Sequence, residues 1–270
     1  MTGLLIKGKL VPVPGLTIVP PASHGGPKWA ALAESDCRPR ETSWVRQVIV
    51  HTTKGDWPQH VIGGSGPGGS DRVVADFWRD DPVHSAAQLV VDTDGSVVCL
   101  CDLAEVVAYH AEASNPWSIG IEMYQVSGGG LYDATLIATT VLVEFLCGNF
   151  GIPQLMPRGP YRNHPLRRME IGSGSTRHQL GGPDCVGVFG HRDNTERRGR
   201  GDPGDEIFAR LAAIGWEGVD YDGSEDLHIG AVRQRALNLR GELLDVDGVC
   251  GPASWAAMRR QGFARWRDVA

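Results

Sequence analysis

The sequence predicts an α/β domain, in which helices cover a β-sheet, followed by a small helical unit. Up to residue 215, short β-branched runs of strand length alternate with longer segments of helical apolar spacing. The 270 residues exceed the ~150 of an average domain. Near residues 216–226 the composition turns to Gly and Asp, as in a linker. We therefore expect an N-terminal arm over 1–40, a main domain over 41–215, a linker over 216–226 and a helical module over 227–270.

Four segments of the main domain are expected to form five strands. QVIVHT (47–52) is a β-branched run typical of a buried strand. QLVVDTDGSVVCL (88–100) predicts two strands joined by a turn at Asp94–Gly95, a dipeptide typical of tight hairpins. WSIGIEM (117–123) and VGVFG (186–190) are apolar runs of strand length and complete the set of segments from which we expect the sheet to form.

Three segments have helical spacing. Residues 72–79 follow Ser70–Asp71, a pair suited to capping a helix N-terminus. Residues 133–149 form a long apolar pattern that stops before Gly151 and Pro153, as helices commonly do. Residues 205–215 place their apolar side chains at helical intervals. These helices are expected to cover the sheet.

The charge and apolar content exclude several classes of function. Lys and Arg total 26 against 32 Asp and Glu, a net charge of −6, whereas nucleic-acid-binding domains usually carry a basic excess. The most apolar stretch, 131–150, contains Asp133 and Glu144, so we expect no membrane insertion. The first residues have an apolar run of only three before Lys7 and therefore do not form a secretory signal. We expect a soluble monomer made in the cytosol. Its six cysteines form no CxxC pair and are expected to be small buried hydrophobes.

The ends of two predicted strands carry histidines. His51 lies at the end of the first run and His191 follows VGVFG, while Asp202 comes eleven residues later in RGRGDPG. Strand ends present side chains on a rigid base, and two imidazoles with one carboxylate suit a tetrahedral Zn²⁺ whose fourth position is left to water. The chain has nine histidines and no HExxH sequence, so a hydrogen-bonded structural histidine at each strand end stays an alternative.

Four ordered motifs connect these residues with a known family. They are VIVHTT (48–53), VVDTDGSVVCL (90–100), AYHAEASNPWSIGIEM (108–123) and GHRDNTERRGRGDPG (190–204). With them, the run from Val48 to Asp205 resembles the zinc-dependent N-acetylmuramoyl-L-alanine amidases, the family that includes phage lysins and peptidoglycan recognition proteins. The resemblance implies a mixed β-sheet flanked by helices, with a zinc groove along one edge. It also implies that His51, His191 and Asp202 hold Zn²⁺ and that Glu122 is the catalytic carboxylate that activates water.

The same resemblance implies roles for other residues of the groove. His110 matches a histidine that touches substrate, and Asn115 lies in the loop that shapes the same groove. Arg200 stands where the family commonly has a lysine; an arginine can hold developing negative charge but cannot hand over a proton. Gln88 stands where the family often has a histidine.

Residues 227–262 resemble a small helical peptidoglycan-binding repeat. The resemblance is carried by Val232, Leu237, Asn238, Gly241, Val246, Asp247, Gly248, Gly251, Pro252, Ser254 and Ala257. Pro252 is expected to begin a helix, where its missing N–H costs nothing. A structural cap on the main domain is the alternative to a wall-binding module.

Together the resemblances imply a peptidoglycan hydrolase that cuts the amide between N-acetylmuramic acid and L-alanine. A phage endolysin, held in the host cytoplasm until it is released to the cell wall, fits the joint presence of wall-cutting and wall-binding parts. The alternatives are a non-catalytic peptidoglycan recognition protein, an amidase that recycles muropeptides, and a toxin delivered by a contractile apparatus.

Overall fold

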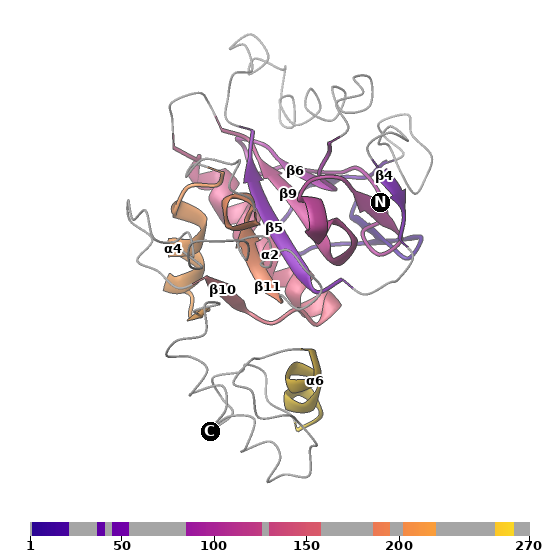
Figure 1. The fold of residues 1–270 in the computed structure, drawn as a ribbon. Helices are drawn as coiled ribbons and strands as arrows, with labels where there is room; N and C mark the ends of the chain where they lie inside the picture. The colour runs from indigo at the N-terminus through magenta and orange to yellow at the C-terminus, as the bar shows by residue number, and fades with distance from the viewer. Residues whose placement is uncertain are drawn as a thin grey trace.

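The computed structural model of the chain describes residues 2–21, 37–40, 45–53, 85–125, 130–157, 186–194, 202–219 and 252–261. A six-stranded sheet with the order β11-β5-β9-β6-β7-β3 lies at its centre (Figure 1). Its strands are β3 (Ile18–Val19), β5 (Gln47–Thr52), β6 (Leu89–Val91), β7 (Val97–Cys99), β9 (Ser118–Met123) and β11 (Gly187–Gly190). The β6–β7 pair is antiparallel and the other neighbours are parallel. The sheet is therefore mixed, and all four expected strand segments are confirmed.

Six strands of three residues each form three further pairs. β1 (Leu4–Ile6) and β2 (Lys9–Val11) are antiparallel, as are β4 (Cys37–Pro39) and β8 (Val106–Ala108). β10 (Leu155–Pro157) runs parallel to β12 (Glu217–Val219). The segment expected to be an arm thus contributes strands, one of which joins the central sheet. Near the start of the segment expected to be a linker, β12 pairs with β10 of the main domain.

The described helices are α2 (Asp133–Phe150), α3 (His191–Asn194), α4 (Glu206–Ala213) and α6 (Pro252–Arg260), with the 3₁₀ helix η3 at Glu112–Trp117. The helices expected over 133–149 and 205–215 are confirmed, and Pro252 begins α6 as expected. The helix expected over 72–79 and most of the C-terminal module lie outside the described residues. α2 contacts β5, β6 and β9 on one face of the sheet and packs beside α4.

The length and composition of α2 would also allow it to cross a membrane. Among the described residues it is the one helix that passes this test, but half of it is buried inside the fold. Its buried side chains, Leu142 and Val143 among them, belong to the same apolar cluster as the sheet. We therefore interpret α2 as the core helix of the domain.

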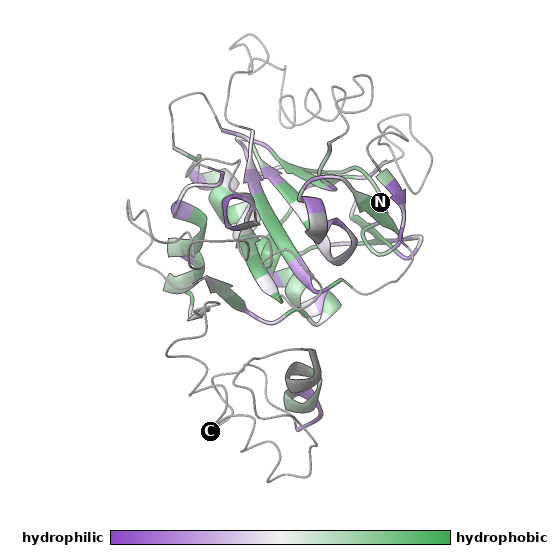
Figure 2. Ribbon diagram, in the orientation of Figure 1, coloured by the Kyte–Doolittle hydropathy of each residue, from purple (hydrophilic) through white to green (hydrophobic). Residues whose placement is uncertain are grey.

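The alternation of side chains along β5 and β9 places most polar side chains of these two strands on the same face. Val48, Val50, Ile119, Ile121 and Met123 belong to the apolar cluster shared with α2. The residues between them, which point to the opposite face because side chains alternate along a strand, include Gln47, His51, Ser118, Gly120 and Glu122. Hydrophobic residues dominate the centre of the sheet and α2 in Figure 2. Most polar residues of the two strands thus lie on the face away from α2.

The turn at Asp94–Gly95 is as tight as the sequence predicts. Gly95 has a φ of +83°, a conformation that side-chain-bearing residues rarely adopt. A Cβ at this position would also lie 2.9 Å from the Ala134 carbonyl oxygen at the start of α2. The hydroxyl of Thr135 donates to the Asp92 carbonyl over 2.8 Å. The hairpin is therefore tied to the N-terminus of the core helix.

The cysteines that the structure describes behave as the sequence predicts. Cys37, Cys99, Cys101 and Cys147 are free thiols and all are buried. Burial raises the pKa of the Cys99 thiol to about 12, so this thiol stays protonated and apolar in character.

The fully buried carboxylate of Asp102 ties the β1–β2 turn to the main domain. Its Oδ2 accepts a hydrogen bond from the Gly8 N–H (2.6 Å). Its Oδ1 accepts three, from the N–H groups of Lys7 (3.0 Å), Ala104 (2.9 Å) and Glu105 (3.1 Å). Four backbone donors from two separate segments therefore share one side chain.

Asp102→Ala should lower the free energy of unfolding by about 2–4 kcal/mol, because four backbone N–H groups lose the charged acceptor that they share. Asp102→Asn, which keeps one carbonyl oxygen, should cost less. Equilibrium denaturant unfolding measures both. Glu105→Ala, which removes an exposed carboxylate from the same loop, is the matched control and should change stability by no more than about 0.5 kcal/mol. Equal stability of Asp102→Ala and this control would contradict the assignment.

Candidate metal centre

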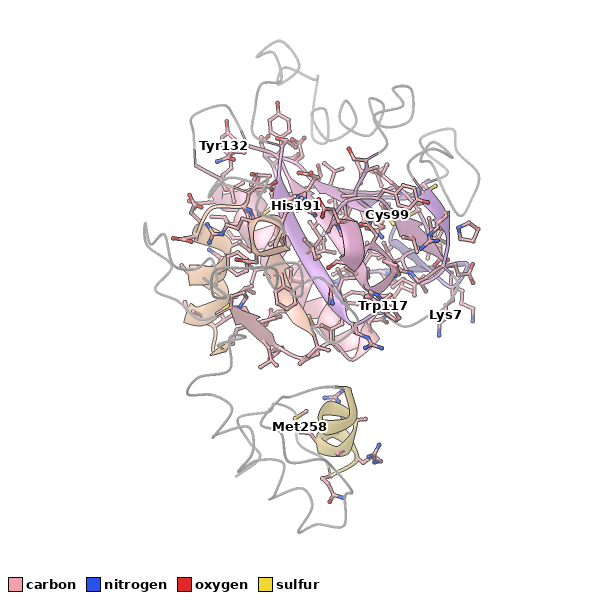
Figure 3. The ribbon with its side chains drawn as sticks, in the orientation of Figure 1. Lys7, Cys99, Trp117, Tyr132, His191 and Met258 are labelled. Carbon is pink, nitrogen blue, oxygen red and sulfur yellow. The ribbon has the colours of Figure 1, made fainter. Side chains whose placement is uncertain are left out.

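Three parallel strands bring the candidate site residues into one row. In the β11–β5 pairing Gly190 lies opposite Val50, so His191 follows at the level of His51. In the β5–β9 pairing His51 lies opposite Glu122. The carboxyl ends of these strands share one edge of the sheet, the edge at which open α/β sheets usually bind ligands. Figure 3 shows His191 beside this edge.

Three of the predicted residues converge as a metal site requires. The Nδ1 atoms of His51 and His191 are 2.8 Å apart, and His191 Nδ1 lies 3.3 Å from Asp202 Oδ2. One donor atom from each of the three residues lies within 4.8 Å of the others. Donors around a tetrahedral zinc ion, with bonds of about 2.0–2.1 Å, are about 3.3 Å apart. The side chains are 2%, 5% and 2% exposed, respectively. Their identity and spacing fit a zinc ion after small shifts.

Asp202 is oriented by hydrogen bonds to its side chain and to its backbone carbonyl. Its Oδ1 accepts the Thr52 N–H over 3.0 Å, at the end of β5. Its backbone carbonyl accepts the Arg192 N–H over 2.7 Å, at the start of α3. These contacts turn Oδ2 toward His191.

Gly190 allows the chain after Asp202 to pass close to β11. A Cβ at this glycine would lie 2.7 Å from Pro203 Cδ and 3.2 Å from an Asp193 carboxylate oxygen. The Gly190 N–H donates to the same Asp193 oxygen over 2.8 Å. An ion pair between Arg192 and Asp205 joins α3 to the start of α4. The absence of a side chain at Gly190 is therefore a condition for the position of Asp202.

Glu122, the predicted catalytic carboxylate, lies in the strand next to that of His51. It lies on the polar face of β9 and is partly exposed, whereas its neighbours Ile121 and Met123 are fully buried. Adjacent parallel strands are about 4.8 Å apart, so its backbone is one strand spacing from that of His51.

His110 lies behind His51 and is only 8% exposed. Its Nδ1 is 3.0 Å from His51 Nε2, and its Nε2 is 3.1 Å from the Ser118 hydroxyl. Burial, followed by the nearby His191 and Arg40, holds the pKa of His110 well below its usual value of 6.5. Both ring nitrogens of this neutral imidazole thus contact the protein itself, and the expected contact with substrate stays a prediction.

Asn115 holds the backbone of its own loop, while its expected place in a substrate groove stays a prediction. Its Oδ1 accepts hydrogen bonds from the backbone N–H groups of His110 (2.9 Å) and Ala111 (2.6 Å). This side chain therefore holds the turn that leads from β8 into η3. The other predicted site residue, Arg200, lies outside the described residues.

Ser118 and Gly120 are contributors that the sequence did not point to, and Gln88, noted only as a departure from the family pattern, is a third. A Cβ at Gly120 would lie 2.7 Å from the His110 ring, so the ring packs directly on the backbone of β9. Gln88 accepts the Gly120 N–H over 2.6 Å and donates to the Ser118 carbonyl over 3.4 Å. The signal for two of them was present, because Ser118, Gly120 and Glu122 follow the two-residue period of one strand face.

Comparison with known proteins supplies an independent finding. The family model described as N-acetylmuramoyl-L-alanine amidase matches residues 40–205, which is more than half of the chain. A search of the curated proteins finds no match.

Several solved structures are similar. The endolysin amidase LysCS from Clostridium intestinale is 12% identical over 75% of this chain and 96% of its own, with a TM-score of 0.42. A selenomethionine derivative of AmpD is 17% identical over 78% and 98%, with a TM-score of 0.41. PGRP-Hd from Alvinella pompejana is 15% identical over 50% and 80%, with a TM-score of 0.39. At these scores the structures add no argument to the family match.

Gly190→Ala should destabilise the protein by about 1–3 kcal/mol, the usual cost of an overpacked position, because the new methyl group meets Pro203. Gly148→Ala is the matched control: its Cβ meets no atom within 4 Å, and in the interior of α2 alanine should stabilise by about 0.5–1 kcal/mol. Thermal and denaturant unfolding of both variants measure these changes. A Gly190→Ala protein as stable as wild type would show that Pro203 does not constrain this position.

Proposed function

Because the chain belongs to the N-acetylmuramoyl-L-alanine amidase family, we propose that it hydrolyses peptidoglycan with a zinc ion held by His51, His191 and Asp202. The bond cut is the amide between the lactyl group of N-acetylmuramic acid and L-alanine of the stem peptide. The convergence of these three donors within 4.8 Å, inside the segment that the family model matches, is the observation that carries the proposal.

The donor set supports a catalytic rather than a purely structural ion. Two imidazoles and one carboxylate leave the fourth position of a tetrahedral zinc ion open, whereas structural zinc sites are closed by four protein ligands. When bound, the ion supplies Lewis acidity, which lowers the pKa of a water ligand to about 7 and polarises the scissile carbonyl. His51 and His191 contribute neutral donors and Asp202 one negative charge.

Glu122 is the residue that we propose moves the proton. As general base, its carboxylate accepts a proton from the attacking water, and as general acid it passes that proton to the leaving amine, a role typically worth about 10²–10⁴-fold in rate. Its partial exposure, one strand from His51, supports this assignment because the substrate must reach the same face. Arg200 is proposed as a second donor to the oxyanion, a role that needs charge but no proton transfer.

We further propose that the protein is a wall-degrading lysin of the phage type. The support is the resemblance of residues 227–262 to a peptidoglycan-binding repeat, since a wall-binding part raises the local concentration of the enzyme on an insoluble polymer. This part would have no use in an amidase that recycles soluble muropeptides. A non-catalytic recognition protein has no need of the complete donor set of His51, His191 and Asp202.

Metal removal should abolish the activity. Purified cell walls incubated with the protein should release stem peptides with a free N-terminal L-alanine, identified by mass. A chelator should stop the release and added Zn²⁺ should restore it. Asp202→Ala should lose at least 100-fold in rate, whereas Asp133→Ala, an exposed carboxylate at the start of α2, should keep wild-type activity. Release that survives complete metal removal would overturn the metal mechanism.

Glu122→Gln should separate catalysis from metal binding. The amide keeps the size of the side chain but cannot accept the proton, so the rate should fall by about 10²–10⁴-fold. The affinity for Zn²⁺, measured by competition with a chromophoric chelator, should stay within about threefold of wild type. Glu144→Gln, the same change at an exposed position of α2, is the control. Near-wild-type activity of Glu122→Gln would remove Glu122 from the reaction.

A further inference from the structure

Behind the metal cluster, a chain of hydrogen bonds leads away from His51 into the protein. It runs from His51 Nε2 to His110 Nδ1 (3.0 Å), from His110 Nε2 to Ser118 Oγ (3.1 Å), and from Ser118 Oγ to the Ser114 carbonyl oxygen (2.7 Å). We call His110, Ser118 and the Ser114 carbonyl the support chain. Ser114 and Ser118 are fully buried and His110 nearly so.

The far end of the support chain determines the direction of every bond in it. A carbonyl oxygen can only accept, so the single hydroxyl proton of Ser118 points to the Ser114 carbonyl. Ser118 Oγ must then accept from His110, so a His110 ring that carries one proton carries it on Nε2. His110 Nδ1 is left with a lone pair and accepts from His51, so His51 carries its proton on Nε2.

On the basis of this polarity, we propose that His110 and Ser118 are positioning residues that hold His51 in the tautomer whose Nδ1 lone pair faces the metal-binding cluster. The inference rests on the proposed metal site. It adds the reason why His51 offers the lone pair of Nδ1 to the metal ion. A ligand histidine must offer a lone pair to the ion, and the partner of its other nitrogen selects which nitrogen that is.

The contacts on the cluster side of His51 fit the same tautomer. His51 Nδ1 is 2.8 Å from His191 Nδ1, which in turn is 3.3 Å from Asp202 Oδ2. A proton on His191 Nδ1 would then have an acceptor on each side. With that proton removed, His51, His191 and Asp202 would offer a metal ion two nitrogen lone pairs and a carboxylate oxygen.

The surroundings hold the support chain in place. His110 can stand against β9 only because Gly120 has no Cβ, and Asn115 fixes the backbone of His110 from the other side. The Arg40 guanidinium donates to the Ser118 carbonyl over 3.0 Å and to the Pro116 carbonyl over 2.5 Å, which ties η3 to β9. The ring that faces His51 therefore has little freedom to turn.

The direct test is the tautomer of His51 in the full-length wild-type chain. With ¹⁵N-labelled histidine and metal removed by a chelator, long-range ¹H–¹⁵N spectra recorded at alkaline pH, where free imidazole is neutral, report which ring nitrogen is protonated. We expect Nε2–H for both His51 and His110. A proton on His51 Nδ1 would overturn the proposal, whether or not the protein binds zinc or cleaves peptidoglycan. Loss of zinc binding by wild type would instead count against the proposed function.

Variants test whether the support chain causes this preference. Ser118→Ala removes the acceptor of His110 Nε2–H, so the His51 signal should shift toward a mixture of tautomers. Its affinity for Zn²⁺, measured by chelator competition, should fall by about 10–100-fold, the usual cost of losing an outer partner of a metal ligand. Ser96→Ala, the same change at another buried serine, is the matched control and should alter neither readout. A folded Ser118→Ala protein with wild-type tautomer and affinity would overturn the role of Ser118.

Discussion

The parallel pairing of β5 with β11 on one side and with β9 on the other is the constraint on which the site depends. It sets His191, His51 and Glu122 in one row at the carboxyl edge of the sheet. Because the side-chain period of a strand is two, a slip of β5 by one residue would turn His51 into the apolar core and expose Val50 in its place. The apolar contacts of β5 with α2 therefore also maintain the geometry of the polar face.

Much of this arrangement could be predicted from the sequence, for physical reasons. The β-branched runs, the Asp94–Gly95 turn and the long apolar pattern of α2 are local signals, and the structure confirms each of them. The approach of His51 to His191 follows once the strands are parallel, because their carboxyl ends then meet at one edge. Asp202 lies in no strand and is held beside them by its hydrogen bonds with Thr52 and Arg192. That two imidazoles and a carboxylate suit zinc could be read from residue type.

The rest depends on contacts that no local pattern encodes. The sequence presents His110 as a histidine in a motif, but the position of its ring depends on Gly120, which gives it room, and on Ser118, whose hydroxyl lies 3.1 Å from its Nε2. Strands as short as Ile18–Val19 and Glu217–Val219 have no periodicity to detect, and they form because a neighbouring strand offers hydrogen-bonding partners. For this reason the arm and the linker predicted from composition both turn out to contain parts of the folded body.

The strand at Ile18–Val19 has a consequence for how copies of the molecule meet one another. Without β3, the edge of β7 that faces away from β6 would have unpaired backbone N–H and C=O groups. A strand of another molecule could pair with such an edge, which favours aggregation. β3 covers that side and is itself only two residues long. Pro20 follows directly and has no N–H with which to continue a ladder. Residues 18–20 therefore make this edge of the sheet a poor partner for a strand of a second molecule.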